Sequence, residues 1–128
     1  MAMHVVVGKP INKADELVAE FARTQDISRW VVPRVAQAGD DVVFYMLNPT
    51  GAFVATGRVA SDPEPGTSDQ GDGSYLSDIS NITMLPKHIE RLTMAAQVPG
   101  WGWPTQPHTA TTIPSDLEAE VNRVLQPR

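Results

Sequence analysis

Aromatic and basic side chains follow one another in the segment from residue 28 to residue 34. Trp30 lies at its centre, with Arg29 before it and Arg34 after it. An indole stacks on any nucleobase because every base has a π-face, and guanidinium groups pair with phosphate, so the pattern is typical of nucleic-acid binding. The same residues also fit a tryptophan that fills the core between two solvated arginines. The sequence leaves both interpretations open.

A second aromatic segment, residues 101–109, holds Trp101 and Trp103 on either side of one glycine. In an extended segment both indoles would project to the same side, because side chains alternate with a period of two. Such a pair would offer a surface to a flat or methylated ligand. The alternative is that one or both indoles close the open end of a barrel.

Motifs for catalysis and metal binding are absent from the sequence, which has no Gly-x-Ser-x-Gly, Walker A or dinucleotide-binding glycine pattern. Residues 69–73 superficially resemble a calcium loop, but Gly71 stands where a ligand is required and no Glu closes the set. The histidines, His4, His88 and His108, lie far apart and are interpreted as structural or exposed. We therefore expect no catalytic residue, no metal and no cofactor.

A β-hairpin is the clearest of the elements that must position these residues. Residues 41–47 are rich in β-branched and aromatic side chains, and residues 52–60 alternate as a strand does. Between them the sequence Asn-Pro-Thr-Gly, residues 48–51, matches a type I turn. We expect the hairpin to form a barrel wall, with Tyr45 and Arg58 reaching its rim.

The other segments predict further strands and helices around this hairpin. Residues 4–8 predict a buried strand, and residues 75–85 predict another with a bulge or bend near Ser80 and Asn81. A last strand is expected at 109–113, and residues 61–74 form a long loop. Helices are expected from Asn12 to about residue 25, from Pro86 with Ile89 and Leu92 facing inward, and from a capping box at Ser115 and Glu118. This order favours an α+β fold, a small curled and mostly antiparallel β-barrel with flanking helices.

Length and charge limit the classes of protein. The 128 residues predict a single domain, residues 1–128, because a chain of this size supports one core. The net charge of −5 argues against unselective coating of phosphates. The absence of cysteine, of a long apolar run and of a signal-peptide pattern leads us to expect a cytoplasmic protein with no membrane partner.

The assembled pattern resembles the PUA-like superfamily, most closely the EVE domains and their YTH relatives. The residues that carry the resemblance are Trp30, the run 39–45, the strand 53–59, Tyr75 and the pair Leu85 and Pro86. The resemblance implies a barrel of five to six strands and a pocket that accepts a flipped modified base. In YTH-like members an aromatic cage holds the methylated base, and its first Trp follows the first helix, where Trp30 stands. Lys9 and Asn12 correspond to the segment that lines the same pocket.

The resemblance to EVE domains further implies that the partner is DNA with a modified cytosine, with RNA as the alternative, and that the protein is associated with a restriction nuclease. We therefore expect a non-catalytic reader, since recognition of one extruded base needs fewer phosphate contacts than coating a strand. The expected contacts are stacking by Trp30 and by Trp101 or Trp103, base-edge contacts from Lys9, Asn12 and Tyr45, and phosphate contacts from Arg29, Arg34 and Arg58. The alternative function is a regulatory module that binds a small molecule or peptide in the same barrel pocket, and its binding would be indifferent to salt.

Overall fold

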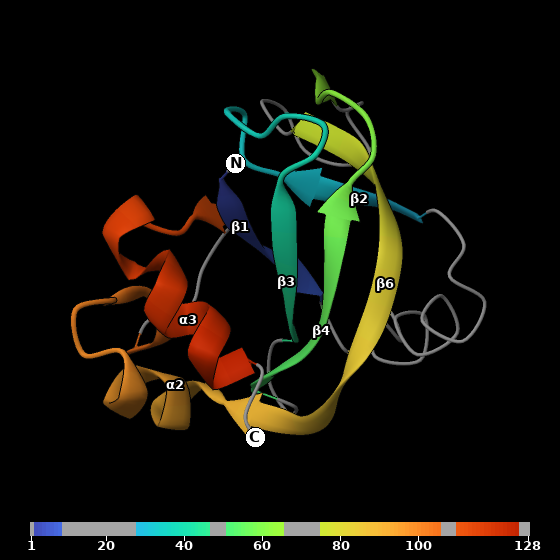
Figure 1. Ribbon diagram of the computed structural model, residues 1–128. Coiled ribbons are helices and arrows are strands. Elements are labelled where there is room, and N and C mark those ends of the chain that lie inside the picture. Colours follow the sequence, from blue (N-terminus) through green and yellow to red (C-terminus); the bar gives the residue numbers. More distant parts are fainter. Residues whose placement is uncertain (1, 9–27, 47–50, 66–74, 106–109, 126–128) are drawn as a thin grey trace.

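A computed structural model describes residues 2–8, 28–46, 51–65, 75–105 and 110–125, with the backbone alone at residues 8, 28 and 29. Its strands form one curled sheet in the order β2-β6-β4-β3-β1-β7, with β5 paired to β6, and the helices α2 and α3 pack together on one side of it (Figure 1). The strands are β1 (Met3–Gly8), β2 (Ser28–Val32), β3 (Asp41–Met46), β4 (Ala52–Val59), β5 (Glu64–Pro65), β6 (Tyr75–Glu90) and β7 (Thr111–Thr112).

The predicted hairpin is confirmed as β3 and β4, which pair antiparallel from Asp41 opposite Arg58 to Met46 opposite Ala52. Gly51 has a φ of 56°, a left-handed value that glycine adopts without strain as the chain enters β4. The predicted turn at 48–51 lies mostly outside the described residues.

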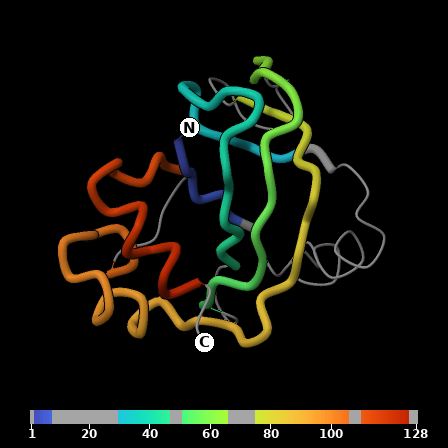
Figure 2. The backbone as a smooth tube through the Cα atoms, in the orientation of Figure 1, coloured from blue at the N-terminus to red at the C-terminus, as the bar shows by residue number. Residues whose placement is uncertain are grey.

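The strand predicted at residues 4–8 is confirmed as β1, and it pairs with β3 in parallel. Every other ladder between described strands is antiparallel. The tube in Figure 2 follows β1, β3, β4 and β6 as neighbouring segments of one curved surface. The prediction of a curled, mostly antiparallel α+β barrel with flanking helices is confirmed, although β5 and β7 have only two residues each.

Strand β3 divides the core into two parts because its residues 42–46 are all buried. Its alternate side chains Val42, Phe44 and Met46 belong to a cluster inside the barrel, which we call the inner cluster. Val43 and Tyr45 belong to a second cluster between the sheet and the helices, which we call the helix-side cluster. Since neighbouring strand residues point to opposite faces, β3 is a wall between two apolar layers.

The bulge predicted near Ser80 and Asn81 is confirmed in β6. Between two matched pairs, β6 advances from Ser80 to Thr83 while β4 moves only from Arg58 to Thr56, so β6 carries an extra residue. Asn81 lies in this bulge with a φ of 54°. A non-glycine residue at positive φ is uncommon, although Asn tolerates it better than most residues.

The helix predicted to begin at Pro86 begins later. Strand β6 continues to Glu90, which pairs with Ala52, and α2 spans Arg91–Gln97. Pro86 lies between Met84 and Ile89, where β6 and β4 are out of register, so its missing N–H breaks no ladder bond. Leu92 is 61% exposed, contrary to the prediction that it faces inward.

The remaining elements agree in part with the sequence. The loop predicted over residues 61–74 contains the short strand β5, and the last predicted strand is observed as β7. The C-terminal helix starts with a 3-10 turn at Ser115–Leu117 and continues as α3 (Glu118–Leu125), which buries Val121 and Leu125. The helix predicted from Asn12 to about residue 25 lies outside the described residues.

Candidate functional site

Trp30 lies on β2 and packs against the inner cluster. Its ring meets Phe44 edge-on, with centroids 5.1 Å apart and an interplanar angle of 74°. Directly opposite it in the ladder stands Ser77, on β6, which is completely buried. Cross-strand neighbours project from the same face of a sheet, so both side chains face the barrel interior.

Both residues carry a buried polar atom without a hydrogen-bond partner in the part of the chain that the structure describes, namely Trp30 Nε1 and Ser77 Oγ. Most buried polar side-chain atoms in proteins are paired, and leaving one unpaired costs about 1–3 kcal/mol. The indole N–H donates, and the hydroxyl donates or accepts. A polar ligand edge or a bound water beside these atoms would supply the missing hydrogen bonds.

Trp101 and Trp103 lie on the other side of β3, in the helix-side cluster. They are only 4% and 6% exposed, and their rings are stacked with centroids 5.8 Å apart and an interplanar angle of 15°. Trp103 also meets Tyr45 edge-on at 5.1 Å. Their surfaces are therefore occupied by the core, where they join the sheet to α2 and α3.

The predicted cage of Trp30 with Trp101 or Trp103 is not formed. Trp30 contacts Phe44, whereas Trp103 contacts Tyr45, the next residue of β3, which points to the opposite face. Tyr45 is likewise a core residue and does not share a cavity with Trp30. Burial raises the pKa of the Tyr45 hydroxyl, and the nearby Arg91 charge offsets only part of that rise.

The predicted cations occupy different places. Arg34 is exposed, and its guanidinium lies 5.5 Å from the ring centroid of Tyr75. Tyr75 pairs with Val32, two positions along the ladder from Trp30, so Arg34 lies beside the strands that hold Trp30 and Ser77. The backbone of Arg29 on β2 pairs with Asp78 on β6, and the Arg29 side chain is not among the described parts of the chain. Lys9 and Asn12 lie outside the described residues.

A second group of basic side chains lines a groove of about 590 Å³ between the end of β6, α2 and α3. Lys87 and His88 come from β6, and Arg123 comes from α3, with Glu90 as the acidic group among them. Sequence patterns did not reveal this groove, because its two cations, Lys87 and Arg123, are 36 positions apart (123 − 87 = 36).

His4 is structural, and its partners were not predicted. The ring is completely buried, with Nε2 2.8 Å from Asp40 Oδ2 and Nδ1 2.9 Å from Thr112 Oγ1. Asp40 also accepts hydrogen bonds from the backbone N–H groups of Ala2 and Gln37. Burial by itself would raise the pKa of Asp40, but the bonds from His4 and these two N–H groups outweigh it and leave the pKa below the usual 3.8.

The described residues contain no cluster of three or more His, Cys, Asp or Glu side chains that suits a metal ion. In the same part of the chain, no helix combines the length and the apolar character that crossing a membrane requires. His88 is exposed in the groove, and His108 lies outside the described residues.

Comparison with known proteins finds the same fold in solved structures of low sequence identity. No protein-family model and no curated protein matches the chain. Protein Atu2648 from Agrobacterium tumefaciens has a TM-score of 0.73 at 14% identity, covering 98% of this chain and 93% of that one. Human THYN1, solved in complex with DNA containing 5-methylcytosine, has a TM-score of 0.74 at 9% identity, covering 100% and 99%. The ASCH protein of Zymomonas mobilis has a TM-score of 0.61 at 8% identity, covering 96% and 95%.

These likenesses show the fold. The chain has the fold of these proteins, as the resemblance to the PUA-like superfamily predicted, and the resemblance to EVE domains is consistent with the likeness to THYN1.

Proposed function

We propose that this protein is a non-catalytic nucleic-acid reader that holds one flipped, modified base against Trp30 inside the barrel, with modified cytosine in DNA as the first candidate. The observation that carries the proposal is the pair of unpartnered buried polar atoms, Trp30 Nε1 and Ser77 Oγ. A base edge would pair with both, and the apolar inner cluster would surround its ring. The fold shared with THYN1, which was solved with 5-methylcytosine DNA, supports the choice of ligand.

The position of Arg34 supports the same assignment. It is exposed beside Tyr75, close along the ladder to Trp30, where a guanidinium would pair with the phosphate next to an extruded base. Lys9, Asn12 and Arg29 stay candidates for contacts with the base or its phosphates. Trp101, Trp103 and Tyr45 are assigned to the core in this proposal because their rings are buried against one another.

A reader without catalysis also agrees with the chemistry of the His4 site. A hydroxyl, an imidazole and a carboxylate do form a chain there, through Thr112, His4 and Asp40. His4 is completely buried, however, and Asp40 is occupied by two backbone N–H groups, so a substrate would not reach the imidazole. We interpret this chain as a structural connection between β1, β7 and the turn before β3.

The experiment is a binding titration by fluorescence anisotropy with matched oligonucleotides that carry cytosine or 5-methylcytosine at one position. We expect tighter binding of the modified strand. Ser77→Ala and Trp30→Phe should each weaken it about two- to tenfold, the cost of one hydrogen bond of about 0.5–1.5 kcal/mol. Ser77→Ala removes only an unpaired hydroxyl, so it should not harm the fold. Ser80→Ala is the matched control, because Ser80 follows Ile79 of the inner cluster and points to the opposite face.

No preference for any modified base, together with unchanged binding by the Trp30 and Ser77 variants, would refute the proposal. The salt dependence separates it from the second class of function, a module that binds a small molecule or peptide. Phosphate contacts give a linear fall of log affinity with log salt concentration, whereas a neutral ligand does not.

A further inference from the structure

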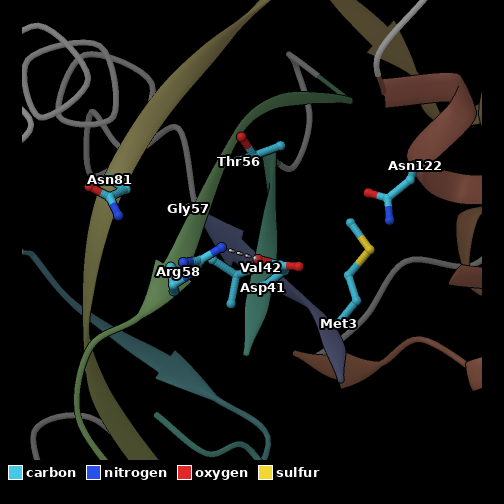
Figure 3. Close-up of a pocket in the computed structure, with 8 residues that line it drawn as sticks. All are labelled: Met3, Asp41, Val42, Thr56, Gly57, Arg58, Asn81 and Asn122. Carbon is cyan, nitrogen blue, oxygen red and sulfur yellow. Dashed lines mark ion pairs between the residues drawn. The ribbon is translucent and has the colours of Figure 1, made fainter. Parts of the chain in front are cut away.

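A second depression is lined in part by Met3 of the helix-side cluster and Val42 of the inner cluster. It measures about 480 Å³ and is bordered by β1, β3, β4, the bulge of β6 and α3. Figure 3 shows Asn81 and Asn122 on opposite sides of it, with Arg58 and Asp41 between them. The lining residues are Met3, Asp41, Val42, Thr56, Gly57, Arg58, Asn81 and Asn122.

Two of the side chains that line this depression are amides without a partner in the described part of the chain. The amides of Asn81 and Asn122 make no hydrogen bond with any other described residue, and both residues are exposed. Asn81 is held at a φ of 54° in the β6 bulge, opposite the register shift between Thr56 and Arg58. Bulges re-aim side chains next to functional sites, and positive φ at a non-glycine residue is often kept where it serves a function.

Arg58 and Asp41 form a pair that a ligand can bridge. They are cross-strand neighbours, and Arg58 Nη2 lies 3.6 Å from Asp41 Oδ1, with the side chains 52% and 43% exposed. This separation exceeds a hydrogen bond, so the guanidinium keeps donors and the carboxylate keeps acceptors for a ligand. The opposite charges also cancel, and Asp41 would repel a phosphate. The site therefore favours an uncharged ligand whose edge carries hydrogen-bond donors for the carboxylate next to a hydrogen-bond acceptor for the guanidinium.

Guanine has such an edge. Its N1–H and N2–H are adjacent donors that match the two oxygens of a carboxylate, and its O6 is the acceptor next to them. Adenine offers a single donor beside an acceptor, and hypoxanthine has the same ring as guanine without the N2 amino group. A depression of about 480 Å³ also lies in the size range of small-ligand sites.

We propose that this depression is a guanine site, in which Asp41 accepts from N1–H and N2–H, Arg58 donates to O6, and the amides of Asn81 and Asn122 contact the remaining polar atoms. Its biological use rests on the proposed reader function, since it would hold an unpaired guanine of the same nucleic acid. The binding chemistry itself concerns only the residues of the depression.

The test is a titration of the isotope-labelled protein with GMP, IMP and AMP, followed by NMR of the backbone and side-chain amides. The three nucleotides share the sugar and the phosphate, so differences between them report on the base. We expect the side-chain signals of Asn81 and Asn122 to move with GMP. IMP should bind roughly tenfold more weakly or worse, because one hydrogen bond to a charged group is lost.

Variants test the assignment of each group. Asp41→Asn should abolish the preference for GMP over IMP. Asn122→Ala should weaken the binding of GMP without removing that preference. Both changes are on half-exposed or exposed side chains, so the folded spectrum should be kept. Gln97→Ala removes an exposed amide of the cationic groove and is the matched control, with no effect expected.

Equal responses to GMP, IMP and AMP, or shifts centred on Lys87 and Arg123 instead, would overturn the proposal in favour of phosphate binding at the cationic groove. Trp30→Phe should leave the GMP response unchanged, so the two sites are tested separately. If modified oligonucleotides fail to bind but GMP binds as described, the reader function fails and the guanine site stands. If only the GMP test fails, the reader function is untouched.

Discussion

Replacing Asp40 by Asn should destabilise the protein, with a dependence on pH that identifies the cause. The carboxylate accepts bonds from His4 Nε2 at 2.8 Å, from the Gln37 N–H at 3.0 Å and from the Ala2 N–H at 3.2 Å. An amide has one oxygen, so its NH₂ group must face at least one backbone donor. One buried donor without a partner costs about 1–3 kcal/mol, and we expect the free energy of unfolding at neutral pH to fall by that amount.

The sign of the pH effect follows from the lowered pKa of Asp40. In the folded protein this pKa lies below 3.8, so the unfolded chain binds the proton first as the pH falls. The stabilisation is therefore present above about pH 4 and is lost as the pH falls through the folded pKa. Asp40→Asn lacks this group, so its deficit relative to wild type should shrink as acid is added.

Urea unfolding at a series of pH values measures both effects. Asp41→Asn is the matched control, since the neighbouring carboxylate is half-exposed and its ion pair with Arg58 is loose at 3.6 Å, and surface changes cost within about 0.5 kcal/mol. A difference between Asp40→Asn and wild type below about 0.5 kcal/mol at neutral pH would refute the reasoning. So would a deficit that persists unchanged in acid.

Two further predictions concern the core. Gly57→Ala should lower the free energy of unfolding in urea by about 1–3 kcal/mol, because the added Cβ would lie 2.8 Å from Ile79 Cγ2. A free energy equal to that of wild type would contradict this prediction, since it would mean that the inner cluster rearranges without cost. Trp103→Ala should lower the free energy of unfolding by about 3–5 kcal/mol, as expected for a buried tryptophan. Leu92→Ala, on the exposed face of α2, is the control and should change this free energy by less than about 0.5 kcal/mol. Loss of ligand binding by folded Trp103→Ala with unchanged stability would contradict its assignment to the core.

Local patterns predicted those parts of the fold whose causes are local. The hairpin followed from two runs of strand-forming residues around a turn sequence, and the β6 bulge followed from broken alternation at Ile79 and Ile82. The start of α2 was placed too early because Pro86 suits the first turn of a helix. What holds this segment in β6 is its pairing with Ala52, and no local pattern contains that information.

Sequence patterns could select residues of the candidate site one at a time, but they could not show which residues lie together in it. Trp30 could be selected from its type and neighbours, but Ser77, its partner across the ladder, is 47 positions away (77 − 30 = 47) and has no distinctive neighbours. The error with Trp101 and Trp103 has a related cause. Their spacing predicted that the two indoles lie close together, and they do. The spacing does not show which face of β3 the two indoles pack against.

The parallel pairing of β1 with β3 has a consequence for the order of assembly. The β3–β4 hairpin closes a connection of five residues, 47–51, whereas the β1–β3 ladder joins Met3 to Asp41 across 38 positions (41 − 3 = 38). On the logarithmic scaling of loop closure this difference costs about 2 kcal/mol of entropy. During synthesis β1 leaves the ribosome well before its partner β3 has been made, so Val5 and Val6 have no strand to pair with until β3 emerges. Strand β1 is therefore made before either of its two partners, β3 and β7, and its ladders close only after the chain has reached them.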